Sequence, residues 1–420
     1  MNEAANFVEG QKNDAQIIED SLTKTMTLRP GNKSPNVKSL QVDAYHNDDK
    51  AATEYNYHSL FGHQQGIATA KIFEDAAERT FIISRSTFAG SGKYVSKWLG
   101  DNHSNYESMK TTTAGIMLFN TFGFSLVGGD ICGFMDQTTA ELCTRWTVIG
   151  AFYPFARNHN GLGEDAQEPY RFEGDDLATM KRAIEIRYEL IRYMYQWMWK
   201  ANVNGGTVWR PQSAEFPADQ TAYENPEMNP MIGDSIKLAL SYDEVTSKNF
   251  YFPNGATWIH LFEPTNVING GNSQDVTTEK TSINAYLRQD KVVQWSYPTH
   301  IGDGSLNTAD LVNAPVVLKQ FHTGRNGVAT GDIVLDDGMD IDATKTHRIS
   351  VSALYTNPLL IGQTSILWTF TVEQGEAIVD AKPYQTLGML EVYNRGFYGY
   401  NPNKEATVTN REGEEFVCVA

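Results

Sequence analysis

Four short segments place charged or hydrogen-bonding side chains among glycines and aromatic residues. An aromatic ring offers a platform for the apolar face of a sugar, and charged groups make strong hydrogen bonds to its hydroxyls. The segments therefore indicate a carbohydrate site. They are SRSTFAGSGKY (84–94), KWLGDNHS (97–104), LVGGDICGF (126–134) and FARNHNGL (155–162), and their candidate residues are Arg85, Trp98, Asp101, Asp130, Phe134 and His159.

Each of these polar residues also has a purely structural interpretation. Asp101 fits a turn and Asp130 fits a cap of the segment that follows it. His159 lies between two asparagines and fits a loop, and Arg85 fits an ion pair of the scaffold. Taken singly, the structural interpretation is favoured. Their joint placement on successive loops after strands favours a site.

The elements that must position these loops alternate between helix and strand. Successive strand–loop–helix units indicate a parallel sheet with crossover helices, hence an α/β layout such as a (β/α)8 barrel. In the last helix, the residues expected on one buried face are Ile184, Tyr188, Ile191, Met194 or Tyr195, and Met198. Helical patterns cover 56–78, 108–123, 138–152 and 176–202, and strands are expected at 80–86 and 124–130.

After about residue 205 the pattern changes to short alternating strands separated by turn residues. This pattern is typical of β-sandwich domains. We therefore expect α/β followed by all-β architecture. The predicted domains are 1–205 for the C-terminal part of a barrel, 206–285 for a proximal β-sandwich and 286–420 for a distal β-sandwich.

Composition and charge limit the kinds of partner. The 420 residues carry a net charge of −17, which repels phosphate backbones and anionic lipid surfaces. Nucleic acid is therefore not an expected partner, whereas a neutral sugar is compatible. The longest apolar stretch, 115–129, is too short to cross a membrane and contains Asn120, so no transmembrane segment is expected.

Three cysteines are present, at 132, 143 and 418. Cys132 and Cys143 stand eleven positions apart, and a zinc site would need four ligands where only His159 is nearby in sequence. Neither a metal nor a cofactor is expected. From the residues alone, two buried thiols and a short-loop disulfide remain equally acceptable.

Long collinear motifs resemble the α-glucosidases of glycoside hydrolase family 31, in the branch of acid maltase, sucrase-isomaltase and maltase-glucoamylase. The resemblance covers most of residues 1–340. It is carried by SRSTFAGSGKY, WLGDN, FNTFGFSLVGGDICGFMDQTTAELCTRWTVIGAFYPFARNHN, QEPYRF, IRYELIRYMY, RPQSAEFP, YFPNGATW, INAYLRQDKVV and GDIVLDDG.

The resemblance implies a (β/α)8 barrel followed by two β-sandwich domains, and a retaining exo-acting α-glucosidase. Two carboxylates flank the scissile bond in such an enzyme. Asp101 matches the acid/base, and Asp130 matches an acidic residue at the pocket floor. Arg85 and His159 match residues that bind sugar hydroxyls. Trp98 and Phe134 match aromatic walls, and Cys132 and Cys143 match a disulfide pair.

The segment MNEAANF (1–7) resembles the downstream side of the family's nucleophile motif, with Ala4 where proline is usual. Met1 is expected to contact substrate, and Glu3 is expected to support catalysis beside the nucleophile. The nucleophile itself would precede Met1. We therefore expect this chain to work with an N-terminal half, carried either by the same polypeptide or by a companion chain.

The expected activity is release of glucose from the non-reducing ends of α-1,4-linked oligosaccharides, with an α-glucan or maltose-type substrate. The alternative is a non-catalytic structural or carbohydrate-binding protein that has the family fold without the nucleophile. The resemblance implies a lysosomal, vacuolar or secreted location, with the ER lumen as the alternative.

Overall fold

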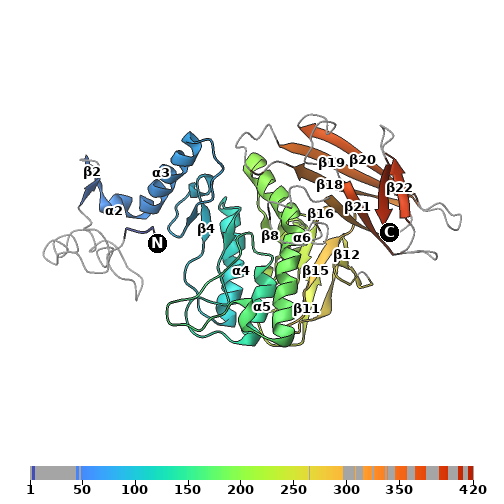
Figure 1. Ribbon diagram of the computed structural model, residues 1–420, viewed down its shortest axis with the longest axis horizontal. Coiled ribbons are helices and arrows are strands. Elements are labelled where there is room, and N and C mark those ends of the chain that lie inside the picture. The colour runs from blue at the N-terminus through green and yellow to red at the C-terminus, as the bar shows by residue number, and fades with distance from the viewer. Residues whose placement is uncertain are drawn as a thin grey trace. The chain divides into compact units, whose positions relative to one another are not determined.

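The computed structural model forms two compact units, Met1–Trp98 and Leu99–Ala420, and each is described by itself (Figure 1). Met1 lies outside the described residues, so its expected role stays a prediction. The structure describes residues 2–4, 44–46, 49–263, 265–296, 308, 316–323, 326–335, 338, 346–356, 365–374, 387–395, 405–409 and 415–419.

The first unit places a helix beside two short parallel strands. Strand β3 pairs in parallel with β4, so that Ile83 lies opposite Ser96 and Ser84 opposite Lys97. Gly62 on α3 permits close packing, since a Cβ there would lie 2.6 Å from the Ser86 carbonyl oxygen. The elements are β1 (Tyr45–His46), β2 (Asp49–Thr53), α2 (Glu54–Tyr57), η2 (His58–Leu60), α3 (Phe61–Asp75), β3 (Ile83–Ser84), η3 (Ser91–Lys93) and β4 (Ser96–Trp98).

The second unit continues the alternation of helices and strands. Side chains at two N-caps satisfy the first free amides of the helices: Asn105 accepts from the Ser108 amide, and Thr139 accepts from the Leu142 amide. Helices α5 and α6 lie side by side (Figure 1). The elements are α4 (Tyr106–Thr121), β5 (Val127–Gly128), β6 (Asp130–Ile131), α5 (Ala140–Gly150), β7 (Arg157–Asn158), η4 (Pro169–Arg171) and α6 (Gly174–Asn204).

The buried face of α6 differs from the predicted one. Ile184 is exposed, and Tyr188, Ile191 and Met198 are only half-buried. Met194, which the spacing offers as a member of the buried face, is buried, and the buried apolar stripe also contains Met180, Ala183, Ile186, Leu190 and Tyr193. The prediction was wrong at the other positions because polar Glu189 and Gln196 lie buried on the same helix, paired with Arg182 and Gln294, and so mask the apolar period.

After α6 the chain is built from short strands, as the turn pattern predicts. Six strands form one sheet in the order β13-β12-β15-β10-β9-β8, and β11 pairs with β14. Phe250, Phe252, Trp258 and Tyr286 form much of its core. The strands are β8 (Trp209–Pro211), β9 (Pro230–Ile232), β10 (Ile236–Leu238), β11 (Ser247–Phe252), β12 (Thr257–His260), β13 (Val267–Asn269), β14 (Asn272–Thr277) and β15 (Ala285–Arg288), with turns η5 (Gln212–Ala214), η6 (Gln220–Tyr223) and η7 (Pro226–Met228).

Further strands belong to separate sheets, in the orders β16-β17-β21, β18-β19-β20 and β22-β23. The chain leaves the six-stranded sheet after Arg288 and enters the next at Val292. The domain boundaries at 205 and 285 stay predictions. The strands are β16 (Val292–Trp295), β17 (Val316–Thr323), β18 (Asn326–Leu335), β19 (His347–Thr356), β20 (Ser365–Gln374), β21 (Leu387–Arg395), β22 (Glu405–Thr409) and β23 (Glu415–Val419).

A lysine lies in the core of the six-stranded sheet. Lys237 is 0% exposed, and its Nζ donates to Asn229 Oδ1 at 2.7 Å and to the Leu238 carbonyl oxygen at 3.3 Å. Nζ also lies 4.9 Å from the centroid of the Phe252 ring. Burial lowers the pKa of Lys237 from 10.5 to about 7, because a charged amine is poorly solvated there.

Lys237→Met is expected to change how stability depends on pH. The unfolded chain binds this proton up to about pH 10.5 and the folded protein only up to about pH 7. The wild-type free energy of unfolding therefore falls as the pH is lowered through that interval, by roughly 2–5 kcal/mol, and the variant lacks this loss. Thermal unfolding between pH 10 and pH 6 measures it, with Lys181→Met as the exposed control. Parallel curves for wild type and Lys237→Met would contradict the expectation.

Candidate active site

The register of two parallel strands forms a partly buried ion pair in the second unit. Strands β6 and β7 pair so that Asp130 lies opposite Arg157. Arg157 Nη2 donates to Asp130 Oδ1 at 2.6 Å, and Asp130 is 0% exposed. A buried carboxylate is tolerated when a cation and hydrogen bonds compensate its lost hydration. The pair therefore fixes the ends of both strands and the loops that follow them.

Asn102 ties the loop that bears Asp101 to the loop after β6. Its side-chain Nδ2 donates to the Asp130 carbonyl oxygen at 3.0 Å, and its Oδ1 accepts from the Phe134 amide at 3.0 Å. The Met135 amide also donates to the Asn102 carbonyl oxygen at 2.9 Å. Asp101 itself is exposed, directly before this anchored residue. An exposed carboxylate on a loop fixed in this way is accessible to a substrate.

The loop after β7 brings His159 to Phe134. Their ring centroids are 5.0 Å apart, with the rings tilted by 41°. The amide of Gly161 donates to the Phe134 carbonyl oxygen at 2.8 Å. Gln167, which is buried, donates from Nε2 toward the carbonyl oxygens of Gly133 (3.2 Å) and His159 (3.1 Å). These hydrogen bonds fix the backbone next to both rings, so the His159 imidazole and the Phe134 ring stay in contact.

A residue on α6 holds the turn that leads into β7. Arg187 donates to the carbonyl oxygens of Ala151 and Pro154 at 3.0 Å each, and also to that of Tyr153. Burial lowers the pKa of Arg187 to about 10. Since the guanidinium satisfies three carbonyl groups of one turn, the long helix directly supports the strand that carries Arg157 and precedes His159.

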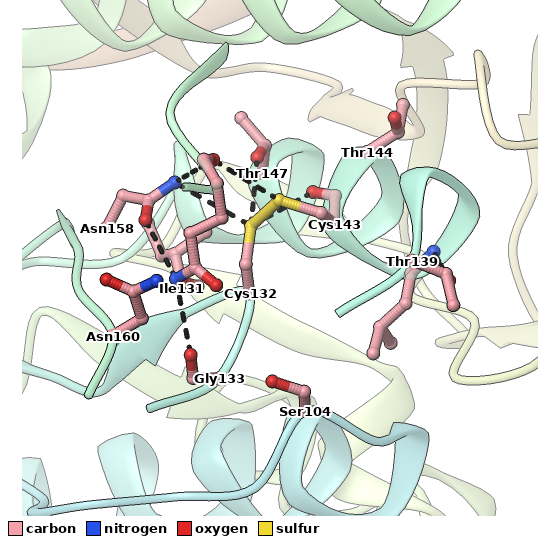
Figure 2. The surroundings of a disulfide bond; sticks show 12 residues. Ser104, Ile131, Cys132, Gly133, Thr139, Cys143, Thr144, Thr147, Asn158 and Asn160 are labelled. Carbon is pink, nitrogen blue, oxygen red and sulfur yellow. Dashed lines mark hydrogen bonds between the residues drawn. A yellow bond between two sulfur atoms is a disulfide. The ribbon is translucent and has the colours of Figure 1, made fainter. Parts of the chain in front are cut away.

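Cys132 and Cys143 form a disulfide that links the loop after β6 to helix α5 (Figure 2). Their Cα atoms are 4.5 Å apart, and both residues are buried. This confirms the pairing that the family resemblance implies. Asn158 lies beside the bridge, with its Nδ2 3.7 Å from Cys132 Sγ and 2.9 Å from the Gln167 carbonyl oxygen (Figure 2). The disulfide therefore supports the segment that carries Phe134.

Removal of this disulfide is expected to lower the free energy of unfolding by about 2–4 kcal/mol, because the short closed loop gains conformational freedom in the unfolded chain. Chemical denaturation of the double variant Cys132→Ser/Cys143→Ser measures the loss. A reductant provides the internal control. It should shift the wild-type transition toward that of the variant and leave the variant's transition in place. Equal transitions for wild type and variant would contradict the expectation.

The first unit holds a second group of predicted residues. Arg85 Nε and Nη2 donate to Glu3 Oε1 and Oε2 at 2.6 and 3.0 Å. The Arg85 guanidinium, through these hydrogen bonds, lowers the pKa of Glu3 from 4.5 to about 2. Asn2 Oδ1 accepts from the amides of Arg85 (3.2 Å) and Ser86 (2.8 Å). The segment at residues 2–4 is therefore bound to the loop after β3 by both side-chain and backbone contacts.

Arg85 also contacts an aromatic ring through its guanidinium, and its carbonyl oxygen accepts a hydrogen bond from a buried amine. Its Cζ is 5.5 Å from the centroid of the Trp98 ring. Lys97 Nζ donates to the Arg85 carbonyl oxygen. Burial lowers the pKa of Lys97 to about 8, and Arg85 adds to this while the Glu3 carboxylate opposes it. The backbone and the guanidinium of Arg85 are thus both held in place.

The structure places the predicted residues in two groups, one in each unit. Glu3, Arg85 and Trp98 form the first, and the loops of Asp101, Asp130, Phe134 and His159 form the second. Their roles in binding and catalysis stay predictions.

Sequence reasoning missed four positioning residues. Arg157 and Asn102 had a signal, because Arg157 lies in FARNHNGL, the same quoted segment as His159, and Asn102 adjoins Asp101. Asn2 lies within the quoted MNEAANF motif. Lys97 had no signal in the sequence, because a lysine is normally expected to keep its charged end in solvent.

No group of three or more His, Cys, Asp or Glu side chains in the described part of the chain could hold a metal ion. No helix among these residues is long and apolar enough to cross a membrane.

Comparison with protein families decides the membership. Residues 1–197 match the Glycosyl hydrolases family 31 TIM-barrel domain, and residues 205–293 match the Glycosyl hydrolase family 31 C-terminal domain. The two matches together cover well over half of the chain. It belongs to glycoside hydrolase family 31. The fold is accordingly that of the family's TIM-barrel domain and C-terminal domain.

Three curated relatives are longer than this chain. Lysosomal alpha-glucosidase of Bos taurus is 34% identical over 355 residues, covering 80% of this chain and 36% of the relative. Intestinal sucrase-isomaltase of Homo sapiens is 32% identical, covering 93% of this chain and 21% of the relative. Alpha-glucosidase of Mucor javanicus is 36% identical, covering 69% and 33% respectively. The chain thus spans about a third or less of these proteins.

Solved family 31 structures share the fold. A GH31 dextranase of Flavobacterium johnsoniae, complexed with glucose, has a TM-score of 0.74 at 20% identity and covers 89% of this chain and 45% of the dextranase. The glucosidase II alpha subunit has a TM-score of 0.68 at 23% identity, covering 77% and 36%.

Proposed function

We propose that this chain supplies the acid/base half of a retaining, exo-acting α-glucosidase that releases glucose from the non-reducing ends of α-1,4-linked oligosaccharides. The observation that carries the proposal is the exposed carboxylate of Asp101 on a loop anchored by Asn102 to the Asp130 strand. Membership of family 31 and the 34% identity to a lysosomal alpha-glucosidase support the choice of reaction and substrate.

In the proposed mechanism, Asp101 first donates its proton to the glycosidic oxygen as the bond to the leaving sugar breaks. A nucleophilic carboxylate outside this chain attacks the anomeric carbon and forms a glycosyl–enzyme ester. Asp101, now ionised, takes a proton from water, and that water attacks the anomeric carbon. The ester breaks, glucose leaves with its α configuration retained, and Asp101 is protonated again.

The other predicted residues have roles in sugar binding in this proposal. Arg85 donates hydrogen bonds to hydroxyls while Glu3 and Lys97 hold it in place. His159 binds hydroxyls from its position beside Phe134, and Trp98 and Phe134 cover apolar faces. Met1 contacts the substrate beside the nucleophile. Asp130 acts through its pair with Arg157, which keeps the loops in register.

The proposal requires a further part of the enzyme, because no residue of this chain is assigned as nucleophile. We infer that an N-terminal half, on the same polypeptide or a companion chain, completes the barrel. It would complete a C-terminal barrel part at 1–205, followed by β-sandwiches at 206–285 and 286–420. The disulfide and the lysosomal relatives support a lysosomal, vacuolar or secreted location, and the ER lumen is the alternative.

Glucose release from maltose by the complete assembly tests the proposal. The assembly should release glucose from maltose and from the ends of longer maltooligosaccharides, one unit at a time. A non-catalytic sugar-binding protein would bind maltose without releasing glucose. That result, obtained with the N-terminal part present and Asp101 intact, would overturn the proposal.

A further inference from the structure

A groove of about 660 Å³ lies on the β-domain that follows the barrel segment. It is lined by residues 215–220, by Tyr251 and Asn254, and by residues 270–272. The name "β-domain groove" refers to these residues below. None of them belongs to the candidate active site. Its volume is within the range of about 300–1,000 Å³ that ligand sites occupy.

Asp219 holds the two walls of the β-domain groove together. Its Oδ2 accepts from the Tyr251 hydroxyl at 2.6 Å and from the Asn254 amide at 2.8 Å, and its Oδ1 accepts from the Thr221 amide at 3.2 Å. Burial alone would raise the pKa of Asp219, but these hydrogen bonds outweigh burial and lower it. Burial and the carboxylate raise the pKa of Tyr251 to about 12, so its hydroxyl remains a donor to Asp219. The groove is therefore pre-formed.

Three amide side chains of the β-domain groove are available to a ligand. Gln220, Asn254 and Asn272 are exposed, and within the described residues their side chains make no intramolecular hydrogen bond. Gly270 keeps the hairpin beside them tight, since a Cβ there would lie 1.9 Å from the Pro253 carbonyl oxygen. Each amide presents both a donor and an acceptor, which is the pairing that a sugar hydroxyl needs.

An aromatic ring stands at the rim of the β-domain groove. Tyr223 is 52% exposed, and its hydroxyl donates to the carbonyl oxygen of the lining residue Pro217 at 3.1 Å. This contact fixes the phenol ring at one end while about half of the side chain stays accessible to solvent. An exposed, fixed ring beside free amides is suited to the apolar face of a pyranose.

The charges of the β-domain groove exclude an anionic ligand. No Lys, Arg or His occurs among the described residues that line it. Its carboxylates already have partners, since Glu215 Oε1 pairs with Arg210 Nη1 at 2.5 Å and Asp219 accepts the three hydrogen bonds described above. A phosphate or carboxylate would find no lining cation to pair with here, whereas a neutral hydroxylated ligand needs none.

We propose that the β-domain groove is a second carbohydrate site, which binds a neutral oligosaccharide chain through Tyr223, Gln220, Asn254 and Asn272. It performs no chemistry. It would hold a glucan on the protein independently of the sugar in the active site. The proposal rests on the proposed function only in the choice of an α-1,4-glucan as the probe.

Isothermal titration of the complete protein with maltoheptaose tests the proposal, with the active site filled by a saturating glucose-like iminosugar. The wild type should show one further maltoheptaose-binding event. Tyr223→Ala and Asn254→Ala should each weaken it about 5- to 10-fold, as expected for a lost ring platform or a lost hydrogen-bonding amide. Gln274→Ala, an exposed amide on the neighbouring strand β14 outside the groove, should leave it unchanged within about twofold.

Failure of this proposal is distinguishable from failure of the proposed function. Absence of maltoheptaose binding while the iminosugar binds would overturn the second site alone. Unchanged affinity in both groove variants would also overturn it. Absence of iminosugar binding and of glucose release would instead contradict the proposed function. Binding of maltoheptaose to the β-domain groove could still be measured in that case. Thermal unfolding of each variant checks that these exposed substitutions leave the fold intact.

Discussion

Replacing Asp101 by asparagine is expected to reduce kcat/KM for maltose by about 10²- to 10⁴-fold in the complete assembly. The amide cannot protonate the glycosidic oxygen or deprotonate the attacking water. An aryl α-glucoside with an acidic phenol as leaving group needs less proton donation. Bond cleavage in that substrate should therefore be much less affected, and burst kinetics should reveal accumulation of the glycosyl–enzyme.

Asp136→Asn is the matched control for this prediction. Asp136 is an exposed aspartate of the loop after β6, paired with His103 Nδ1 at 2.8 Å, and it has no proposed role in proton transfer. Its replacement should change kcat/KM by no more than about twofold to threefold. An equal loss of kcat/KM for maltose and for the aryl glucoside in Asp101→Asn would contradict the assignment of Asp101 as the acid.

Arg85→Lys is expected to reduce kcat/KM by about 10- to 100-fold in the complete assembly. Lysine keeps the charge but cannot make the two parallel hydrogen bonds that Arg85 makes to Glu3. The remaining amine would lose its fixed position over Trp98, so that hydroxyl binding and catalysis should both suffer. Steady-state kinetics with maltose measures the loss.

Lys71→Met is the matched control in the same unit. Lys71 pairs with Asp75 at 2.8 Å, but both side chains are about two-thirds exposed. Exposed pairs contribute little, so this variant should retain wild-type kinetics. Wild-type activity in Arg85→Lys would contradict the role of the Glu3–Arg85 pair in holding a substrate-binding guanidinium.

The same pair predicts a pH dependence of stability. The pKa of Glu3 is lowered from 4.5 in the unfolded chain to about 2 in the folded protein. The stabilisation is therefore complete above about pH 4.5 and is lost as the pH falls toward 2. The difference in thermal stability between wild type and Glu3→Gln should thus persist at pH 5 and shrink by pH 2.5. A difference that grows on acidification would contradict this assignment.

Much of the candidate site follows from residue types placed after strands. Asp130 and His159 could be expected near each other because the sequence places both on loops that follow strands, and such loops meet at one edge of a parallel sheet. The exact partners could not be predicted, because the opposition of Asp130 to Arg157 depends on strand register. A shift by one residue would place Asn158 there instead.

Other features depend on tertiary packing that no local pattern records. Most of the buried face of α6 was misplaced because buried Glu189 pairs with Arg182 of the same helix, and buried Gln196 accepts a hydrogen bond from Gln294, 98 residues along the chain. The sequence suggests a solvated side chain for Lys237. It lies in the core because its amine donates to Asn229 and lies over the Phe252 ring. The β-domain groove joins residues 215–220 to residues 251–272 through Asp219, a contact that spacing alone does not suggest.

The stereochemistry of the glucose first released from methyl α-maltoside tests the central claim most directly, because the leaving group is then methyl α-glucoside and the only free glucose comes from the non-reducing end. Proton NMR of the complete assembly, recorded before mutarotation, distinguishes the two anomers. A retaining α-glucosidase with Asp101 as acid/base should release α-glucose first, and Asp101→Asn should release almost none. Initial release of β-glucose, or unchanged release by Asp101→Asn, would contradict the account.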